Sequence, residues 1–423
     1  MNEYIKDTME MTDFIRRSPS PYHVIRNITS ELEAAGFEKL TEKKPFSLQK
    51  GHSYYVTRNS SSIIAFRIPE KFMGFSIAAA HTDSPCFRIK PSCEAENHGY
   101  TRLNVEKYGG MLMAPWFDRP LSIAGRVFVN KDGNPEERLF ETDGPAVSIV
   151  NLAIHQNRDA NNGIKYSVQK ELMPIFAQDA PKGSFRSFVA SRLGVREDDI
   201  LDWDLCLSDT TPPAVWGREK EFFSSPRIDD LQCAHSAFRA LKETEPKDRI
   251  SMIALFDNEE VGSGTGQGAL SDFLSSVTDR ILLSLGASGE ERYLHLASSF
   301  MISADNGHAV HPNYAEKSDI TNSPRLNGGI LVKYSANQKY TTDASTGSEL
   351  KSLMNANGIP YQVFVNNSDV LGGSTLGNLS IQKVSVRTAD IGVAQLAMHS
   401  PYECGGTKDT TALLSLFRAF LSL

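Results

Sequence analysis

The chain has 423 residues, a length that predicts two domains because single hydrophobic cores stop growing before that size. Apolar residues make up 40% and charged residues 22%, as in folded globular proteins, which argues against a disordered chain. The net charge of −7 argues against nucleic-acid or anionic-membrane binding, because both require dense Lys/Arg patches.

The first residues lack the continuous apolar segment of a signal peptide, and no window approaches the roughly 20 apolar residues of a membrane span. The five cysteines form no CxxC pair, so neither a disulfide framework nor a thiolate zinc site is expected. A cytoplasmic location suits this cysteine usage, because the cytoplasm keeps thiols reduced. The cysteines are Cys86, Cys93, Cys206, Cys233 and Cys404.

The first 80 residues predict two helices followed by strands. Apolar residues recur with helical spacing on both sides of the SPSPY break at residues 18–22, and Gly36 is suited to end the second helix. Three apolar, strand-like runs then follow one another. They are SYYVT (53–57), SIIAFRI (62–68) and FSIAAA (75–80).

The middle of the chain has a different pattern of predicted secondary structure from both ends. It predicts strands at RLNVEKY (102–108), AGRVFV (124–129) and AVSIV (146–150), and a helix at SFRSFVASRLG (184–194). From about residue 225 a helix and strand alternation returns. Its segments are DDLQCAHSAFRALKE (229–243), RISMIALFD (249–257), SDFLSSVTDRILLSL (271–285) and SFMISAD (299–305).

This alternation predicts an α/β fold with a mainly parallel sheet and helices on both faces. The simplest division is an α/β domain formed by residues 1–90 together with 225–423. We expect residues 91–224 to form a β-rich domain inserted into it.

Metal-ligand residue types follow four apolar runs at the point where each expected strand ends. Ligands in open α/β sheets bind at the carboxyl ends of strands, so these side chains are expected to meet in one crevice. A lone acid or histidine at a strand end is more often a cap or a loop hydrogen bond, but four such endings favour a site. The endings are His81 with Asp83, residues 257–260, Asp305 with His308 and His311, and His399.

A fifth candidate is Asp229, next to Asp230 at the start of an expected helix. Helix capping is the alternative explanation, and Asp230 can serve as the cap while Asp229 faces the crevice. The combined set of two imidazoles and three carboxylates suits Zn²⁺, with Mn²⁺ and Co²⁺ as alternatives. Five ligands exceed the need of one zinc ion, so a bridging carboxylate and two metal ions are expected. The set is His81, Asp229, Glu260, Asp305 and His399.

The adjacent Glu259 and Glu260 predict a division of roles, because neighbouring side chains at a strand end point in different directions. We expect Glu260 to bind metal and Glu259 to act as the general base toward a metal-activated water. Asp83 is expected to orient the imidazole of His81 or to tune the metal. The following glycines match neither GxGxxG nor GxxxxGK[ST], so nucleotide binding is discounted.

Nine short motifs are spread over nearly the whole chain. They are SPSPYH (18–23), AHTDSP (80–85), YGGMLMAPWFDRPLSIAGRV (108–127), LAIH (152–155), SSPRIDDL (224–231), DNEEVGS (257–263), SADNGHAVHPNY (303–314), NQKY (337–340) and DIGVAQLAMHSPYE (390–403). Together, and in this order, they resemble the aspartyl aminopeptidase family of dinuclear zinc peptidases. Each motif alone is weak, whereas the set is specific.

The resemblance implies a catalytic metallopeptidase domain and an inserted domain that contacts other subunits of a homo-oligomer, assembled as a dodecamer. It implies that Asp229 bridges two zinc ions. His81 and Asp305 would complete the ligands of one ion, and Glu260 and His399 those of the other. The same resemblance gives Glu259 the role of base and places Asp83 beside it.

Four further residues match family positions that contact substrate, and they are His155, His308, Lys333 and Tyr340. The resemblance implies that a neighbouring subunit supplies His155. A lysine or histidine suits a pocket for an acidic P1 side chain, because a buried carboxylate must be paired. The chain has SPRIDD where the family often has SPRLDN, and Met111, Leu112 and Met113 give an apolar lining, so substrate preference stays open.

The sequence therefore predicts a cytoplasmic zinc metalloaminopeptidase that releases N-terminal residues, with Asp and Glu expected, from peptides. No nucleic acid or membrane partner is expected. One alternative is a broad or neutral-residue aminopeptidase with the same mechanism. Others are a catalytically inactive assembly or binding protein, and a deacylase on the same scaffold.

Overall fold

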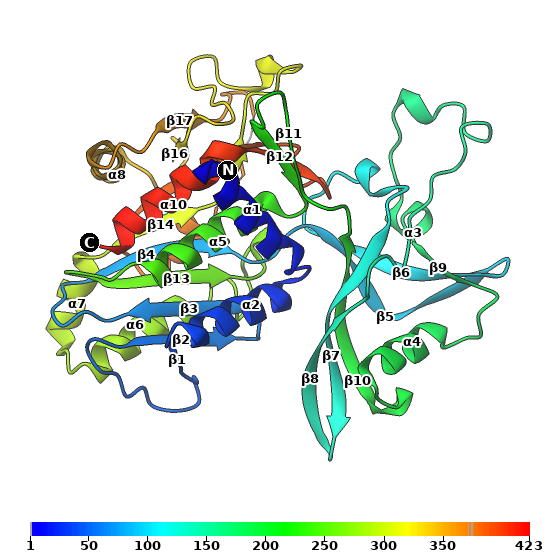
Figure 1. Ribbon diagram of the computed structural model, residues 1–423, viewed down its shortest axis with the longest axis horizontal. Helices are drawn as coiled ribbons and strands as arrows, with labels where there is room; N and C mark the ends of the chain where they lie inside the picture. Colours follow the sequence, from blue (N-terminus) through cyan, green and yellow to red (C-terminus); the bar gives the residue numbers. More distant parts are fainter. Residues whose placement is uncertain (1, 371, 374) are drawn as a thin grey trace.

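The computed structural model describes residues 2–370, 372–373 and 375–423 of the chain (Figure 1). Its strands form two sheets, a large mixed sheet and a smaller antiparallel one. Helices flank the large sheet on the left of Figure 1, and the antiparallel sheet stands beside it on the right. The α/β fold class predicted from the sequence is confirmed.

The centre of the large sheet is parallel. Strands β13 (Ile250–Phe256), β4 (Phe75–His81), β14 (Phe300–Ala304) and β18 (Arg387–Leu396) lie side by side in this order and run parallel. Every residue of β4 and β13 is buried, because other elements cover both faces of the sheet. This double burial explains why these strands are apolar almost without interruption.

Shorter strands complete the large sheet on both sides of this centre. Strands β3, β2 and β1 extend one edge, whereas β19, β12 and β11 extend the other, and β15 and β16 pair with β18. Their bounds are β1 (Glu38–Lys39), β2 (Ser53–Arg58), β3 (Ser62–Arg67), β11 (Ala214–Trp216), β12 (Phe222–Ser225), β15 (Gly307–His308), β16 (Ile330–Tyr334), β17 (Tyr361–Val365) and β19 (Glu403–Gly406).

Helices cover both faces of the large sheet. Along β4, Ala78 and Ala80 join a core with α1, α2, α5 and α10, whereas Ile77 and Ala79 join a second core with α6. No helix in the described part of the chain is both long and apolar enough to cross a membrane. The helices are α1 (Glu3–Arg16), α2 (Pro21–Ala34), α5 (Ile228–Glu243), α6 (Phe273–Ser284), α7 (Gly289–Ala297), α8 (Ala344–Ala356), α9 (Leu376–Ser380) and α10 (Thr407–Leu421).

The antiparallel sheet has its own hydrophobic core. Its strands follow the order β8-β7-β10-β5-β6-β9, and α4 packs Phe185 and Val189 into the core beneath it. All six strands lie within residues 86–209. The division into residues 1–90 with 225–423 and an inserted domain of residues 91–224 stays a prediction. The elements are β5 (Cys86–Asn97), β6 (Tyr100–Tyr108), β7 (Leu121–Lys131), β8 (Asn134–Glu141), β9 (Ile175–Gln178), β10 (Ile200–Asp209), α3 (Val168–Glu171) and α4 (Ser184–Leu193).

Most elements expected from hydrophobic periodicity are present, and one is not. The two N-terminal helices and the helix at residues 184–194 are confirmed as α1, α2 and α4. The strand expected at residues 146–150 is wrong. Its residues make only isolated bridges, from Val147, Ser148 and Ile149 to three different segments, so no continuous ladder forms.

Candidate active site

The carboxyl ends of the central strands bring the predicted ligands together. His81 is the last residue of β4 and lies opposite Phe256, the last residue of β13. Glu259 and Glu260 follow β13, and Asp305 follows β14, which is the other neighbour of β4. Because these strands are parallel, their ends open onto one edge of the sheet, as the sequence predicted.

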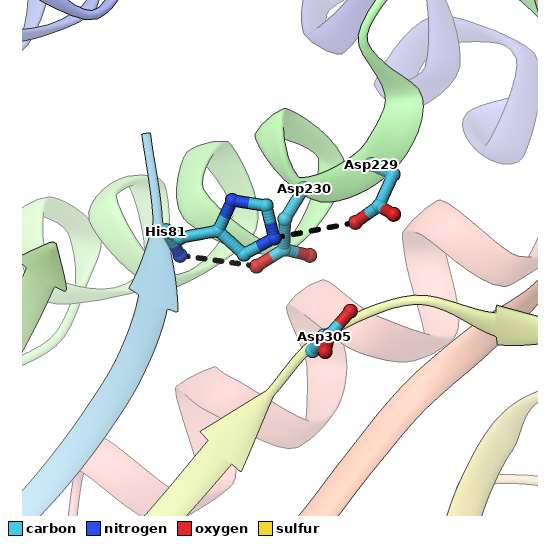
Figure 2. A group of neighbouring side chains, drawn as sticks. All are labelled: His81, Asp229, Asp230 and Asp305. Atoms are coloured by element: carbon cyan, nitrogen blue, oxygen red, sulfur yellow. Dashed lines mark hydrogen bonds and ion pairs between the residues drawn. The ribbon is translucent and has the colours of Figure 1, made fainter. Parts of the chain in front are cut away.

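Asp229 lies between two histidines. Its Oδ1 is 3.4 Å from Nε2 of His81, and its Oδ2 is 3.4 Å from Nε2 of His399. Nε2 of His399 is also 3.4 Å from Oε1 of Glu260. Figure 2 shows Asp229 and Asp305 directed toward the space beside His81. Asp229 therefore has one carboxylate oxygen beside each of the two histidines.

Three groups of side chains could each hold a cation, and two of them include Asp229. The candidate ligand atoms within each group lie within 4.8 Å of one another. Within the described residues, Oδ1 of Asp229 and Oε1 of Glu260 are buried and accept no hydrogen bond. Orphaned carboxylate oxygens beside imidazole nitrogens fit zinc. The groups that share Asp229 are His81, Asp229, Asp230 and Asp305, and Asp229, Glu260 and His399; the third group is His81, Glu259 and Glu260.

The start of α5 turns two adjacent acids in different directions. Arg227, before this helix, has a left-handed backbone and makes no side-chain capping bond. Asp230 does not cap the helix as the sequence had suggested; its Oδ2 accepts a hydrogen bond of 3.2 Å from the backbone N–H of His81. Asp230 is therefore a further acid in the group around His81, which the sequence did not predict.

The turn after β13 separates Glu259 from Glu260. Asn258 adopts a left-handed conformation with φ of 65°, which asparagine tolerates better than most residues. The carboxylate of Asp83 then accepts hydrogen bonds from the backbone N–H groups of Glu259, at 3.2 Å, and Glu260, at 3.1 Å. This leaves both glutamate side chains free to face the site.

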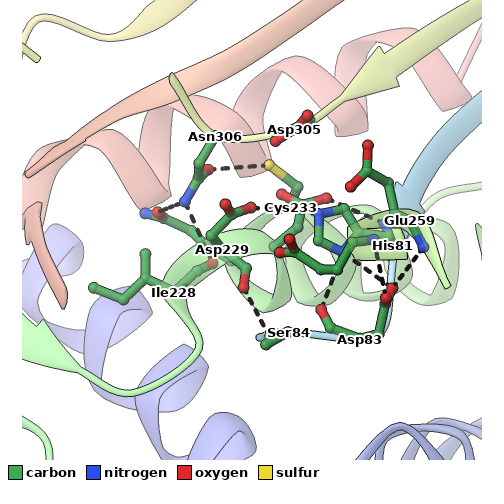
Figure 3. A network of polar contacts seen from close by, with 12 residues as sticks. His81, Asp83, Ser84, Ile228, Asp229, Cys233, Glu259, Asp305 and Asn306 are labelled. Carbon is green, nitrogen blue, oxygen red and sulfur yellow. Dashed lines mark hydrogen bonds and ion pairs between the residues drawn. The ribbon is translucent and has the colours of Figure 1, made fainter. Parts of the chain in front are cut away.

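Asp83 also holds the ring of His81. Nδ1 of His81 lies 3.0 Å from the backbone oxygen of Asp83 and 3.4 Å from its Oδ1. A hydrogen bond at Nδ1 leaves Nε2 as the nitrogen available to a metal. The predicted contact between the two residues is present, and the contact to the backbone oxygen is shorter than the contact to the carboxylate (Figure 3).

Burial and crowding shift the pKa values of the site. Burial disfavours the charged form of His399, but Asp229 and Glu260 outweigh it and raise the pKa of His399 to about 10. Burial also opposes the charge of Asp229, but His399 and His81 hold its pKa well below the usual range. Burial, with the charge of Asp229, raises the pKa of Glu260 well above its usual range. A divalent cation would compensate the negative charge of these closely spaced carboxylates.

A cavity of about 290 Å³ opens onto these residues. Three of the four residues predicted to contact substrate line it, and they are His308, Lys333 and Tyr340. The ammonium of Lys333 is buried and donates a hydrogen bond of 2.9 Å to the backbone oxygen of Asn306. The fourth residue, His155, is exposed in the segment after residue 150 and does not line the cavity.

Three residues at the site were not singled out from the sequence. The Tyr108 hydroxyl donates to Asp83, the Gly109 backbone lies against Glu260, and the Glu403 carboxylate accepts from the backbone of Asp229 and His399. All three lie within the motifs quoted above. In the sequence, the available signal for Glu403 was a glutamate four residues after His399 within the motif at 390–403.

The family model described as Aminopeptidase I zinc metalloprotease (M18) matches residues 14–421. The chain belongs to this family. It is 42% identical over 433 residues to the Probable M18 family aminopeptidase 2 of Clostridium acetobutylicum, with 100% of both chains covered. M18 members are zinc aminopeptidases, so the chain is a metalloaminopeptidase that hydrolyses peptide bonds.

Solved structures of M18 relatives share the fold. A chain in the cryo-EM structure of the Ape4 and Nbr1 complex superposes with a TM-score of 0.95 at 35% identity, covering 99% of this chain and 86% of that one. The mApe1 dodecamer of S. cerevisiae gives a TM-score of 0.87 at 27% identity, covering 99% of this chain and 97% of that one. The M18 zinc-peptidase fold therefore extends over essentially the whole chain.

Proposed function

We propose that this M18 aminopeptidase uses Glu259 as its general base beside two zinc ions. The ions would be held by His81, Asp229 and Asp305 and by Asp229, Glu260 and His399, and Mn²⁺ or Co²⁺ could replace zinc. When bound, the metals would polarise the scissile carbonyl and make a water molecule acidic. Glu259 takes the proton of the attacking water on its carboxylate and delivers it to the leaving amine nitrogen.

The position of Glu259 is the observation that carries this assignment. Its carboxylate is grouped with His81 and Glu260, yet it lies outside the two groups that share Asp229. Burial, opposed in part by the charge of His81, raises the pKa of Glu259 to about 8. Bound cations would lower this pKa and favour the carboxylate form, which is the form that accepts a proton.

Substitution of the adjacent glutamates separates the two roles. Glu259→Gln is expected to retain both metal ions and lose kcat by at least about 100-fold, the usual contribution of a general base. Glu260→Gln is expected to lose metal, measured as bound zinc per chain after dialysis. Full activity of Glu259→Gln, or loss of metal from that variant alone, would show that the roles are wrong.

We propose a preference for Asp or Glu at the substrate N-terminus. Lys333 supports it, because its ammonium lies in the cavity wall and has donors beyond the one given to Asn306. The nearby carboxylate of Asp305, 3.9 Å from the ammonium, weakens that attraction. The alternative is a broad or neutral preference. Values of kcat/KM on Asp, Glu, Leu, Ala and Lys substrates, with a chelator control, decide between them.

We also propose a homo-oligomer, with a dodecamer as the expected state, in which His155 enters the active site of a neighbouring subunit. Exposed apolar residues precede this histidine, with Val150 at 51%, Leu152 at 58% and Ile154 at 48% exposure. An apolar group of this kind on an exposed segment is typical of a docking surface. The dodecamer of S. cerevisiae mApe1 supports the assembly state.

Co-expression tests the shared site. His155→Ala and Glu259→Gln should each be nearly inactive alone, whereas mixed pairs combine the intact His155 of one subunit with the intact Glu259 of the other. Random pairing would restore about a quarter of the wild-type sites. No recovery in purified mixed oligomers would place His155 outside the neighbouring site.

We also propose a cytoplasmic location, which the five free thiols support.

A further inference from the structure

Behind the candidate metal site, one buried carboxylate holds two of the proposed ligands by their backbones. Glu403, at the start of β19, is 3% exposed. Its Oε1 accepts a hydrogen bond of 2.8 Å from the backbone N–H of His399, and its Oε2 accepts one of 3.1 Å from that of Asp229. The two oxygens of a single rigid group thus fix two residues that lie near opposite ends of the segment 225–423.

The backbone around His399 depends on such a partner. Ala397 and His399 have φ values of 55° and 64°, in the left-handed region that non-glycine residues rarely occupy. His399 follows the end of β18, so the sheet ladder no longer pairs its N–H group. Strained conformations persist where the surroundings over-determine them, and the carboxylate of Glu403 supplies that constraint here.

A chain of buried side chains in turn holds Glu403. Gln395 donates from Nε2 to Oε1 of Glu403 at 3.2 Å, and Asn306 donates from Nδ2 to Oε1 of Gln395 at 2.7 Å. Asn306 also contacts the start of α5 through the backbone oxygen of Ile228, at 3.3 Å (Figure 3). The network therefore joins the ends of β14, β18 and β19 to the helix that carries Asp229.

We propose that Glu403 is a positioning residue that sets the distance between Asp229 and His399 and so forms the subsite completed by Glu260. This inference rests on the ligand assignment of the proposed function. Glu403 does not act on the substrate. It acts through the backbones of two ligands, as outer-shell partners of metal sites do. Loss of either hydrogen bond would let the two ligands drift apart.

Zinc titration of the full-length, metal-free protein tests this role. Glu403→Gln keeps the shape of the side chain but places an NH₂ group against one of the two backbone N–H groups. We expect the midpoint for the second zinc ion to rise 10- to 100-fold, measured by competition with a chromophoric chelator. Excess zinc should restore kcat to the wild-type value, a rescue that a folding defect would not give.

Asp409 provides a matched control. This fully buried carboxylate on α10 also accepts two backbone N–H groups, from Asn327 at 2.7 Å and Gly329 at 2.9 Å, and none of the three residues lines the cavity. Asp409→Asn should therefore lose the same stability that any buried carboxylate loses when an amide replaces it, and it should keep wild-type zinc affinity. Equal zinc affinities of Glu403→Gln and the wild type would overturn the inference, as would an equal loss in both variants.

Two more variants keep the outcomes separable. Gln395→Met removes the donor to Glu403 without changing the carboxylate, so it should weaken binding of the second zinc ion by a smaller factor. This variant tests the inference even if Glu403→Gln does not fold. Asp229→Asn removes the shared ligand and should weaken both ions. Wild-type zinc binding by Asp229→Asn would refute the ligand assignment itself. Loss in Asp229→Asn but in neither Glu403→Gln nor Gln395→Met would refute only the role of Glu403.

Discussion

The hydroxyl of Tyr108 donates a hydrogen bond of 2.6 Å to Oδ2 of Asp83, the residue that holds the ring of His81. Tyr108 is the last residue of β6 and therefore belongs to the antiparallel sheet, whereas Asp83 follows β4 of the large sheet. The same hydroxyl accepts a hydrogen bond of 2.9 Å from Nδ2 of Asn258, beside the two glutamates. The antiparallel sheet thus supports the site within one chain, in addition to any role between subunits.

Removal of this hydroxyl should weaken the site selectively. Tyr108→Phe leaves Asp83 with one donor fewer and Asn258 without its acceptor, both in buried surroundings. We expect a loss of 1–3 kcal/mol in unfolding free energy. Activity or zinc affinity should fall about 10- to 100-fold, because an outer-shell partner is lost. Tyr100→Phe, at the exposed start of the same strand, is the control. Equal activity of the two variants would contradict the prediction.

Gly109 lies where a side chain would clash with Glu260. Its φ is 76°, and a Cβ atom there would sit 3.1 Å from Cβ of Glu260 and 3.4 Å from its Oε2. Gly109→Ala should therefore lower the unfolding free energy by about 1 kcal/mol through backbone strain and also displace Glu260 from its proposed place as a metal ligand. Gly133→Ala separates the two effects, because Gly133 has a φ of 84° and nothing within 4 Å.

Bound zinc per chain and unfolding free energy measure the outcome in both glycine variants. Both should lose similar stability from the left-handed backbone, and only Gly109→Ala should lose zinc. If Gly109→Ala keeps two zinc ions, the packing of this glycine against Glu260 is unimportant for the site.

The sequence predicted the part of the site that depends on parallel strand ends. His81 is the last residue of β4, Asp305 directly follows β14, and Glu260 follows β13. An apolar run marks where each of these strands stops, and parallel neighbours end at the same edge. Their convergence therefore follows from local patterns. His399 lies beyond the last residue of β18, on a left-handed turn, so its approach to Asp229 depends on Glu403 as well.

The supporting residues could not be derived in the same way. Tyr108 ends a strand of the antiparallel sheet, where alternation predicts only which side chains are buried. Its contact with Asp83 depends on how the two sheets lie against each other. Likewise, the two acids that open α5 resemble ordinary capping residues in sequence, and only tertiary structure shows that Asp230 bonds to His81 instead.

A buried histidine outside the cavity of the site should govern part of the loss of stability in acid. His235, on α5, packs its ring 5.0 Å from that of Phe14, and its Nδ1 is buried without a hydrogen-bond partner in the described part of the chain. Burial, together with the charges of Arg239 and Lys242, lowers the pKa of His235 to about 3. Between about pH 6.5 and 3 the unfolded chain binds a proton there that the folded chain does not.

Stability should therefore fall as the pH falls through this window, by up to about 1.4 kcal/mol per pH unit from this one group. His235→Phe keeps a ring against Phe14 and removes the titration, so its unfolding free energy should decline less steeply below pH 6.5. Denaturant unfolding at several pH values measures these slopes, and parallel curves for the variant and the wild type would refute the assignment.

Asp230 should make the metal-free protein less stable at neutral and alkaline pH. It is fully buried, and burial together with the charges of Asp305 and Asp229 raises its pKa well above the usual range. Because the folded state then holds a proton that the unfolded state releases, stability declines as the pH rises above about 4.

Asp230→Asn keeps an oxygen to accept the N–H of His81 and removes the charge. In the presence of chelator, this variant should unfold at higher denaturant concentration than the wild type, by about 1 kcal/mol or more at pH 8. The gain should shrink toward pH 4, and also with saturating zinc, since a bound cation already compensates the wild-type carboxylate. Asp132→Asn, on the exposed turn between β7 and β8, should change neither quantity. A gain for Asp230→Asn that is the same at pH 4 and pH 8 would mean that its charge is not what destabilises the metal-free site.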